Sequence, residues 1–137
     1  MQQVAVDANV FVSYLTGRHE KQYDAAQALL RAAEDGDIVA LLPQFVVFEV
    51  SYVLQSLYNL SGVRLASTIR ALVSFPGVQI VDDWPWKRVL EIWSDPLPGL
   101  ADASIVAVAM TNRYGAVATF DKKLANKLES FGLTAYF

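Results

Sequence analysis

The chain contains no cysteine and a single histidine, and these two shortages exclude several kinds of site. Disulfides, thiol nucleophiles and cysteine-ligated zinc all need a thiol that the chain does not have. The lone histidine, His19, excludes zinc sites of the HExxH type and any mechanism that requires two imidazoles. Chemistry at a catalytic site must therefore come from other side chains.

Phosphate-binding glycine patterns and long apolar runs are also missing. The seven glycines form neither a GxxxxGK nor a GxGxxG pattern. The longest apolar run, over residues 38–50, is interrupted by Pro43, Gln44 and Glu49, and it is too short to cross a bilayer. The N-terminus lacks the positive charge and the apolar segment of a signal peptide. We therefore expect a cytoplasmic protein with no membrane association.

Charged residues are scarce. They make up 18% of the chain against 54% hydrophobic residues, and the formal net charge is -3. The excess of apolar residues is typical of a helix-rich domain or of an extra apolar surface for a partner. The balance is unlike the basic surface of most nucleic-acid binders. A basic group does gather near the C-terminus, at Arg113, Lys122, Lys123 and Lys127. The simpler interpretation is that these residues form a solvent-exposed helix face. The alternative is that they contact phosphate groups of a nucleic acid.

Short apolar segments alternate with helical patterns along the 137 residues, which predicts one domain over 1–137. Strands are expected at 4–6, 38–42, 78–81 and 116–119, with a final edge strand at 134–137. A helix follows residue 7, and further helices are expected at 21–34, 43–59, 63–75, 84–94, 100–114 and 122–130. This alternation indicates an α/β fold: a three-layer sandwich with a central, mostly parallel sheet of four to five strands flanked by helices.

Four acidic residues occupy unusual places in this pattern. Asp7 and Asp121 directly follow predicted strands, and Asp102 opens the most apolar helix. Glu49 shares a helix face with Phe45 and with residues 52 and 53, and an apolar face should point at the core. Each aspartate has a simpler interpretation as a helix N-cap. The simpler interpretation of Glu49 is a buried acid that pairs with an arginine or a backbone amide.

As a set, the four acids indicate a metal site. An α/β sheet gathers the residues that follow its strands at one edge, where ligands bind. Several carboxylates at close range cannot all remain charged without a counter-charge. Mg²⁺ supplies that charge and prefers oxygen ligands and water. Such an ion can activate a water molecule and neutralise charge on a phosphodiester.

The segments around the acids resemble, in order and spacing, the acidic motifs of PIN-domain nucleases. They are Val-Asp-Ala-Asn-Val-Phe (6–11), Phe-Glu-Val (48–50), Ala-Asp-Ala-Ser-Ile-Val (101–106) and Thr-Phe-Asp-Lys-Lys-Leu (119–124). The resemblance covers essentially the whole chain. Small members of this family are typically VapC-like toxins of toxin–antitoxin pairs. The resemblance implies bound Mg²⁺ or Mn²⁺ and endonucleolytic cleavage of RNA by an activated water. It also implies a homodimer and a cognate antitoxin.

The family pattern assigns catalytic and metal-binding roles to Asp7, Glu49, Asp102 and Asp121. In our hypothesis Asp7 and Asp102 hold the metal. Glu49 orients or deprotonates the attacking water or acts as a further ligand, and Asp121 ligates or supports the metal, directly or through water. Supporting positions are Asn9 and Thr119, and candidate RNA contacts are Lys122 and Lys123. The chain departs from the pattern at Lys123, where some members carry a further acid.

Two other functions fit part of the pattern. A phosphatase of the haloacid-dehalogenase type also has an aspartate after its first strand, but it carries an Asp-x-Asp sequence where this chain has Asn9. A non-catalytic binding or dimerisation module could keep the same fold with an inactive site. The retention of four acids argues against this second alternative, because buried carboxylates destabilise a fold without a cation.

Overall fold

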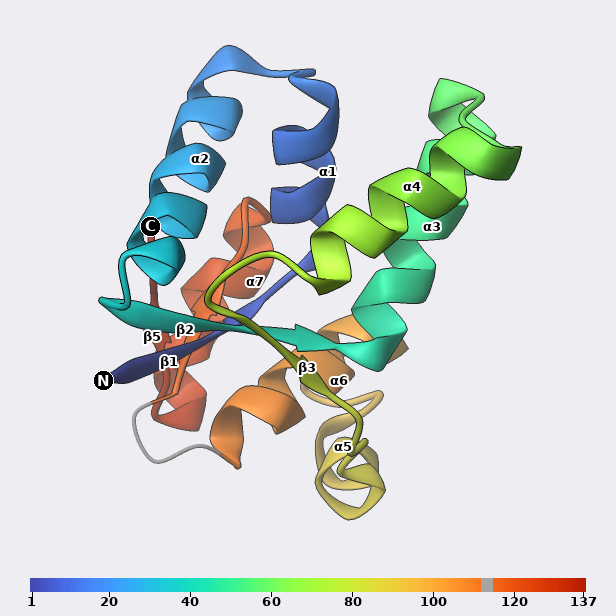
Figure 1. The fold of residues 1–137 in the computed structure, drawn as a ribbon. Helices are drawn as coiled ribbons and strands as arrows, with labels where there is room; N and C mark the ends of the chain where they lie inside the picture. The colour runs from blue at the N-terminus through green and yellow to red at the C-terminus, as the bar shows by residue number, and fades with distance from the viewer. Residues whose placement is uncertain (112–114) are drawn as a thin grey trace.

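Five short strands form one parallel sheet in the computed structural model, which describes residues 1–111 and 115–137 (Figure 1). The strand order is β3-β2-β1-β4-β5, and every neighbouring pair is parallel. The strands are β1 (Gln2–Val6), β2 (Ile38–Pro43), β3 (Val78–Val81), β4 (Ala116–Ala118) and β5 (Thr134–Ala135). The predicted parallel sheet is therefore confirmed, with five strands.

Helices cover both faces of this sheet. Figure 1 shows α1 and α2 on one side and α5 and α6 on the other, which is the predicted three-layer arrangement. The described helices are α1 (Ala8–Thr16), α2 (Glu20–Glu34), α3 (Gln44–Tyr58), α4 (Gly62–Val73), α5 (Trp86–Ile92), α6 (Leu100–Met110) and α7 (Lys122–Lys127), followed by the 3-10 helix η1 (Leu128–Phe131). No helix within the described ranges is both long and apolar enough to cross a membrane.

Several predicted boundaries differ from the observed ones. The helix expected over 84–94 begins only at Trp86, because Pro85 precedes its first turn. The helix expected over 122–130 changes to 3-10 geometry after α7, and the last strand has two residues in place of four. Pro43, expected in a first helical turn, has extended backbone angles and ends β2. The end of the helix expected over 100–114 falls on residues 112–114, outside the described residues.

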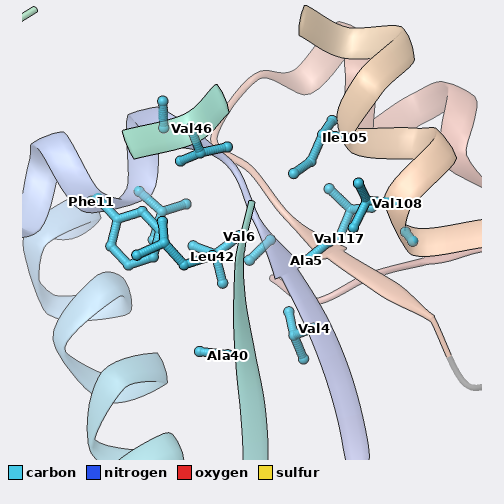
Figure 2. Close-up of a cluster of buried hydrophobic side chains, with 14 of the residues drawn as sticks. Val4, Ala5, Val6, Phe11, Ala40, Leu42, Val46, Ile105, Val108 and Val117 are labelled. Atoms are coloured by element: carbon cyan, nitrogen blue, oxygen red, sulfur yellow. The ribbon is translucent and has the colours of Figure 1, made fainter. Parts of the chain in front are cut away.

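The core lies on both sides of β1. Val4, Ala5 and Val6 are fully buried, which explains why this strand is a continuous apolar run without alternation. Figure 2 shows side chains of α1 and β2 on one side of β1 and side chains of α6 on the other. Helix α6 is buried over most of its length, and its alanines let it approach the sheet closely. The central strand is thereby enclosed by both helical layers.

The strand order creates a reversal point beside β1. The chain runs outward from β1 to β2 and β3, and then returns to form β4 on the opposite side of β1. Ligand sites of open parallel sheets lie at such points, beyond the carboxyl ends of the strands. The backbone N–H of Asp7 donates to the carbonyl oxygen of Ala118 at 2.9 Å, so the two strand ends are joined at this point.

The turn between α4 and β3 packs against the end of α2. Gly77 has a φ of +83°, and a Cβ built on it would lie 2.0 Å from the carbonyl oxygen of Ala33. Gly36 has almost the same angle, +82°, but has nothing within 4 Å of such a Cβ. A residue with a side chain would therefore experience the same backbone strain at both positions, but only at position 77 would its Cβ also clash with neighbouring atoms.

We expect Gly36→Ala to lower the free energy of unfolding by about 1 kcal/mol, which is the strain of the left-handed conformation. Gly77→Ala should lower it by at least about 2 kcal/mol more, because backbone must move to admit the methyl group. Urea unfolding of the two variants measures the difference. Equal losses would show that α2 and the Gly77 turn are not packed as described.

Candidate active site

One cleft at the carboxyl end of the sheet contains all four acids singled out in the sequence. Its volume is about 260 Å³. Asp7 reaches it from the end of β1, Glu49 from α3, Asp102 from α6, and Asp121 from the start of α7. The full lining is Asp7, Ala8, Asn9, Val12, Arg18, Glu49, Val53, Ala101, Asp102 and Asp121. Residues that are more than 100 positions apart in the chain therefore meet at the reversal point.

Asp7 is held by hydrogen bonds to both of its carboxylate oxygens. Its Oδ1 accepts from the backbone N–H of Ala8 at 2.8 Å, so Asp7 does cap α1. Its Oδ2 accepts from the Thr119 hydroxyl at 2.8 Å and from Asn9 Nδ2 at 3.3 Å. The capping interpretation and the site interpretation thus both hold for Asp7.

Asn9 and Thr119 link the ends of β1 and β4. Asn9 Nδ2 donates to the Thr119 hydroxyl oxygen at 3.1 Å, and Asn9 Oδ1 accepts from the backbone N–H of Phe120 at 3.1 Å. The Thr119 oxygen also accepts from the backbone N–H of Asp121 at 3.1 Å. Thr119 is buried behind the cleft, whereas Asn9 lines it. Together these two side chains fix the direction of the Asp7 carboxylate.

Asp121 is the N-cap of α7. Its Oδ1 accepts from the backbone N–H groups of Lys123 at 2.9 Å and Leu124 at 3.3 Å. Its Oδ2 accepts no hydrogen bond from the described residues, so one oxygen remains available at the cleft. As with Asp7, the simple capping role and the position at the cleft belong to the same side chain.

Asp102 is not an N-cap. Gly99 occupies that position in α6, and Asp102 lies in the first turn. The capping interpretation was wrong because the N-cap lies three residues before Asp102, at Gly99. A carboxylate in the first turn is stabilised by the helix dipole. Its oxygens accept no hydrogen bond within the described part of the chain.

Glu49 lies at the border between core and solvent. The expectation that its face points into the core was wrong in part: Phe45 is buried, but Tyr52, on the same face, is 71% exposed. The suggested pairing of Glu49 with an arginine or a backbone amide was also wrong. Its carboxylate has no hydrogen bond or ion pair among the described residues. Glu49 instead faces the cleft.

The acids raise one another's pKa values. Burial raises the pKa of Asp7, and the charges of Asp102 and Asp121 raise it further against the lowering effect of the hydrogen bonds from Thr119 and Ala8. Burial, and then the charges of Asp7 and Asp102, raise the pKa of Glu49 to about 7. Burial and Asp121 raise the pKa of Asp102, and Lys127 opposes them. Within the described ranges the one ion pair joins Arg88 and Glu91, outside the cleft. The described lining of the cleft therefore carries more negative than positive charge.

The donor set suits a partly hydrated divalent ion. No group of three or more histidine or acidic side chains in the described residues already has the arrangement of a metal-binding site. Mg²⁺ typically takes only one or two protein carboxylates and completes its octahedron with water and substrate phosphate. Four carboxylates line one open cleft, and those of Glu49 and Asp102 accept no hydrogen bond from the described residues, which meets that requirement.

A family model for the PIN domain matches residues 4–128. The chain belongs to the PIN-domain family. Among solved structures, this PIN domain is similar to VapBC2 from Rickettsia felis bound to a DNA fragment from their promoter. The TM-score is 0.67 at 12% identity, over 99% of this chain and 100% of that one. It is also similar to PAE2754 from Pyrobaculum aerophilum, with a TM-score of 0.63 at 20% identity over 98% and 90% of the two chains. No curated protein sequence matches it.

Lys122 and Lys123, the candidate RNA contacts of this PIN domain, are exposed in the first turn of α7 and do not line the cleft. Arg113 lies outside the described residues. Among the described residues, the cation that lines the cleft is Arg18, which sequence reasoning missed. Arg18 stands in a short turn between two helices, where no periodicity or motif marks a residue.

The pKa of Glu49 gives this PIN domain a pH-dependent stability. An acid whose pKa is higher in the folded state than in the unfolded chain keeps its proton longer in the folded state. Folding stability is therefore complete below the unfolded pKa and is lost as the pH rises through the folded pKa. For Glu49 this window runs from the ordinary value of 4.5 to about 7.

We expect the melting temperature of metal-free protein to fall between about pH 4.5 and pH 7, and we expect Glu49→Gln to reduce that fall. Thermal unfolding in EDTA across this range measures both. Glu129→Gln, at an exposed glutamate of η1, is the matched control and should leave the slope unchanged. A Glu49→Gln slope equal to that of the wild type would show that the Glu49 carboxylate is not desolvated.

Proposed function

We propose that this PIN domain is a divalent-metal-dependent endoribonuclease that hydrolyses RNA phosphodiester bonds with an activated water. The observation that carries the proposal is the meeting of four carboxylates, none of which forms an ion pair among the described residues, in one cleft at the reversal point of the sheet. Such a cluster stabilises bound cations and destabilises the empty fold, which is typical of a site kept for function.

Asp7 and Asp102 are the residues we assign to hold Mg²⁺ or Mn²⁺, with Asp121 as a further ligand or as a support through water. When bound, the ion acidifies water and neutralises charge on the phosphodiester. Asp7 is suited to direct ligation because Thr119 and Asn9 fix its orientation before any ligand arrives. Pre-set ligands avoid the cost of reorganisation during the reaction.

Glu49 is the residue we assign to take the proton from the attacking water. A general base works best when its pKa lies near the working pH, and burial and its acidic neighbours raise the pKa of Glu49 to about 7. Its carboxylate is free of hydrogen bonds within the described residues, so both oxygens can accept a proton or orient water. Lys122 and Lys123, exposed beside Asp121, are assigned to the RNA backbone outside the cleft.

The partners we propose are an antitoxin protein and a second copy of the chain. The motifs resemble VapC-like toxins, and the similarity to the VapBC2 structure supports the same assembly. Helix α3 carries Phe48, Tyr52 and Leu57, which are 72%, 71% and 70% exposed. Phe48 and Tyr52 lie one turn apart on this helix, and large side chains exposed side by side favour a protein interface. A toxin that acts on cellular RNA would work in the cytoplasm.

Purified, partner-free protein should cleave RNA with Mg²⁺ or Mn²⁺ and should lose the activity in EDTA. Asp7→Asn and Asp102→Asn should each reduce the rate at least about 100-fold, because the metal loses a charged ligand. Cleavage of a mixed RNA pool, followed on gels, measures the effect. Asp24→Asn, at an exposed aspartate of α2, is the matched control and should retain full activity.

Cleavage that persists in the Asp7→Asn protein would identify a contaminant and remove support from the proposal. A protein that shows neither cleavage nor a thermal shift with divalent ions would instead be a non-catalytic binding module. A phosphoryl group trapped on Asp7 would identify a phosphatase.

A further inference from the structure

The cleft continues beyond the four acids, and its lining changes along its length. Val12 lies five residues after Asp7 on α1, and Val53 lies four residues after Glu49 on α3. These separations correspond to about 6–8 Å along a helix axis. Arg18, just past the end of α1, also lines the cleft. Among the described residues the lining thus combines carboxylates, apolar side chains and one guanidinium.

The position of Arg18 is set by the turn that joins α1 to α2. Gly17 adopts the left-handed conformation, with φ of 62°, and its N–H donates to the carbonyl of Ser13. The Thr16 hydroxyl donates to the carbonyl of Val12 at 2.7 Å and accepts from the backbone N–H of Arg18 at 3.3 Å. His19 then caps α2. The backbone of Arg18 is therefore held on both sides by helix caps.

The guanidinium of Arg18 does not serve the carboxylates as a counter-ion. It forms no ion pair with them, since the one pair within the described ranges joins Arg88 and Glu91. The pKa values of Asp7, Glu49 and Asp102 are shifted by burial and by other charges, and Arg18 is not among the causes. Its five donors therefore have no partner among the described residues.

We propose that Arg18 binds an RNA phosphate that flanks the scissile one, an inference that rests on the proposed function. With the scissile phosphate at the acids, a strand that continues along the cleft past Val53 would bring a flanking phosphate to Arg18. A planar guanidinium binds phosphate with two parallel hydrogen bonds, which a lysine cannot reproduce.

The charge of the cleft makes the contact between Arg18 and phosphate important for RNA binding. Four carboxylates line the cleft and repel a polyanion, whereas Arg18 is the one cation among the lining residues described. A metal held by the acids would offset the repulsion at the scissile phosphate, and a flanking phosphate would still need a cation of the protein. Arg18 thus positions the strand across the site without taking part in the bond-breaking step.

Two measurements test the assignment. The first is KM and kcat for Mg²⁺-dependent cleavage of a short single-stranded RNA. Arg18→Gln should raise KM about 10-fold with a small change in kcat, and Arg18→Lys should raise it less, because the charge is kept and the paired hydrogen bonds are lost. Arg64→Gln, at an exposed arginine of α4, removes the same charge outside the cleft and should leave KM unchanged.

The second measurement is binding without cleavage. In EDTA, the Asp7→Asn protein and its Arg18→Gln derivative are titrated with a fluorescent single-stranded RNA at several KCl concentrations. Loss of one phosphate contact should weaken binding and reduce the slope of log K against log salt by about 0.7. The same Asp7→Asn protein with Arg64→Gln should keep the parent slope.

The outcomes separate this inference from the proposed function. Normal cleavage by the wild type, with KM and salt slope unaltered in Arg18→Gln, overturns the phosphate assignment alone. Absence of cleavage together with Arg18-dependent RNA binding overturns the nuclease and keeps the phosphate site. Absence of both cleavage and binding overturns the two together. A fall in kcat without a change in KM would place Arg18 at the reacting phosphate and would also overturn the assignment.

Discussion

The pairing of β1 with β4 is the constraint on which the rest of the site depends. It joins two chain segments more than 100 residues apart, and it is extended past the strands by the hydrogen bond from the Asp7 N–H to the Ala118 carbonyl. Thr119 and Asn9 then tie the side chain of Asp7 to the same junction. A shift of one residue in this register would reverse the faces of β4 and separate Thr119 from Asp7. Because both strands are buried and apolar on both faces, burial alone does not fix this register, and the hydrogen bonds of Asn9 and Thr119 at the strand ends favour the observed one.

Stability and chemistry oppose each other at this junction. A folded domain usually pairs or exposes its carboxylates, but here burial and mutual repulsion raise the pKa values of three of them. The resulting loss of stability is offset by apolar burial elsewhere: the sheet is enclosed between helical layers, and α6 is buried over most of its length. Sites that break the ordinary rules of stability in an otherwise consistent fold are where function concentrates.

The fold and the four acids could be predicted from sequence because each leaves a local mark. Strands β1, β2 and β4 are continuous apolar runs, and Asp7 and Asp121 stand where those runs stop. Glu49 and Asp102 are acidic residues within helices whose sequences are otherwise strongly apolar. The order of strands in a parallel sheet then brings strand ends together without further information.

What could not be predicted depends on distances between elements. The exposure of Tyr52 follows from how far α3 extends beyond the sheet, and the place of Arg18 follows from a single left-handed glycine. The start of α6 at Leu100 was predicted, but Asp102 was mistaken for a possible N-cap because the actual N-cap, Gly99, provides no capping side chain that would mark it in the sequence. Such features need coordinates because no residue pattern encodes them.

The double use of Asp7 and Asp121 has an evolutionary consequence. Each caps a helix through Oδ1, and the other oxygen does not take part in the cap: Asp7 Oδ2 accepts from Thr119 and Asn9, and Asp121 Oδ2 accepts no hydrogen bond from the described residues. Asparagine caps helices as well as aspartate does, so the exchange of an oxygen for an amide preserves the cap and removes the charge. A single nucleotide change in an aspartate codon suffices for this exchange. A lineage can therefore silence the site while the scaffold and its surfaces persist, and inactive descendants of this fold need not pass through an unfolded ancestor.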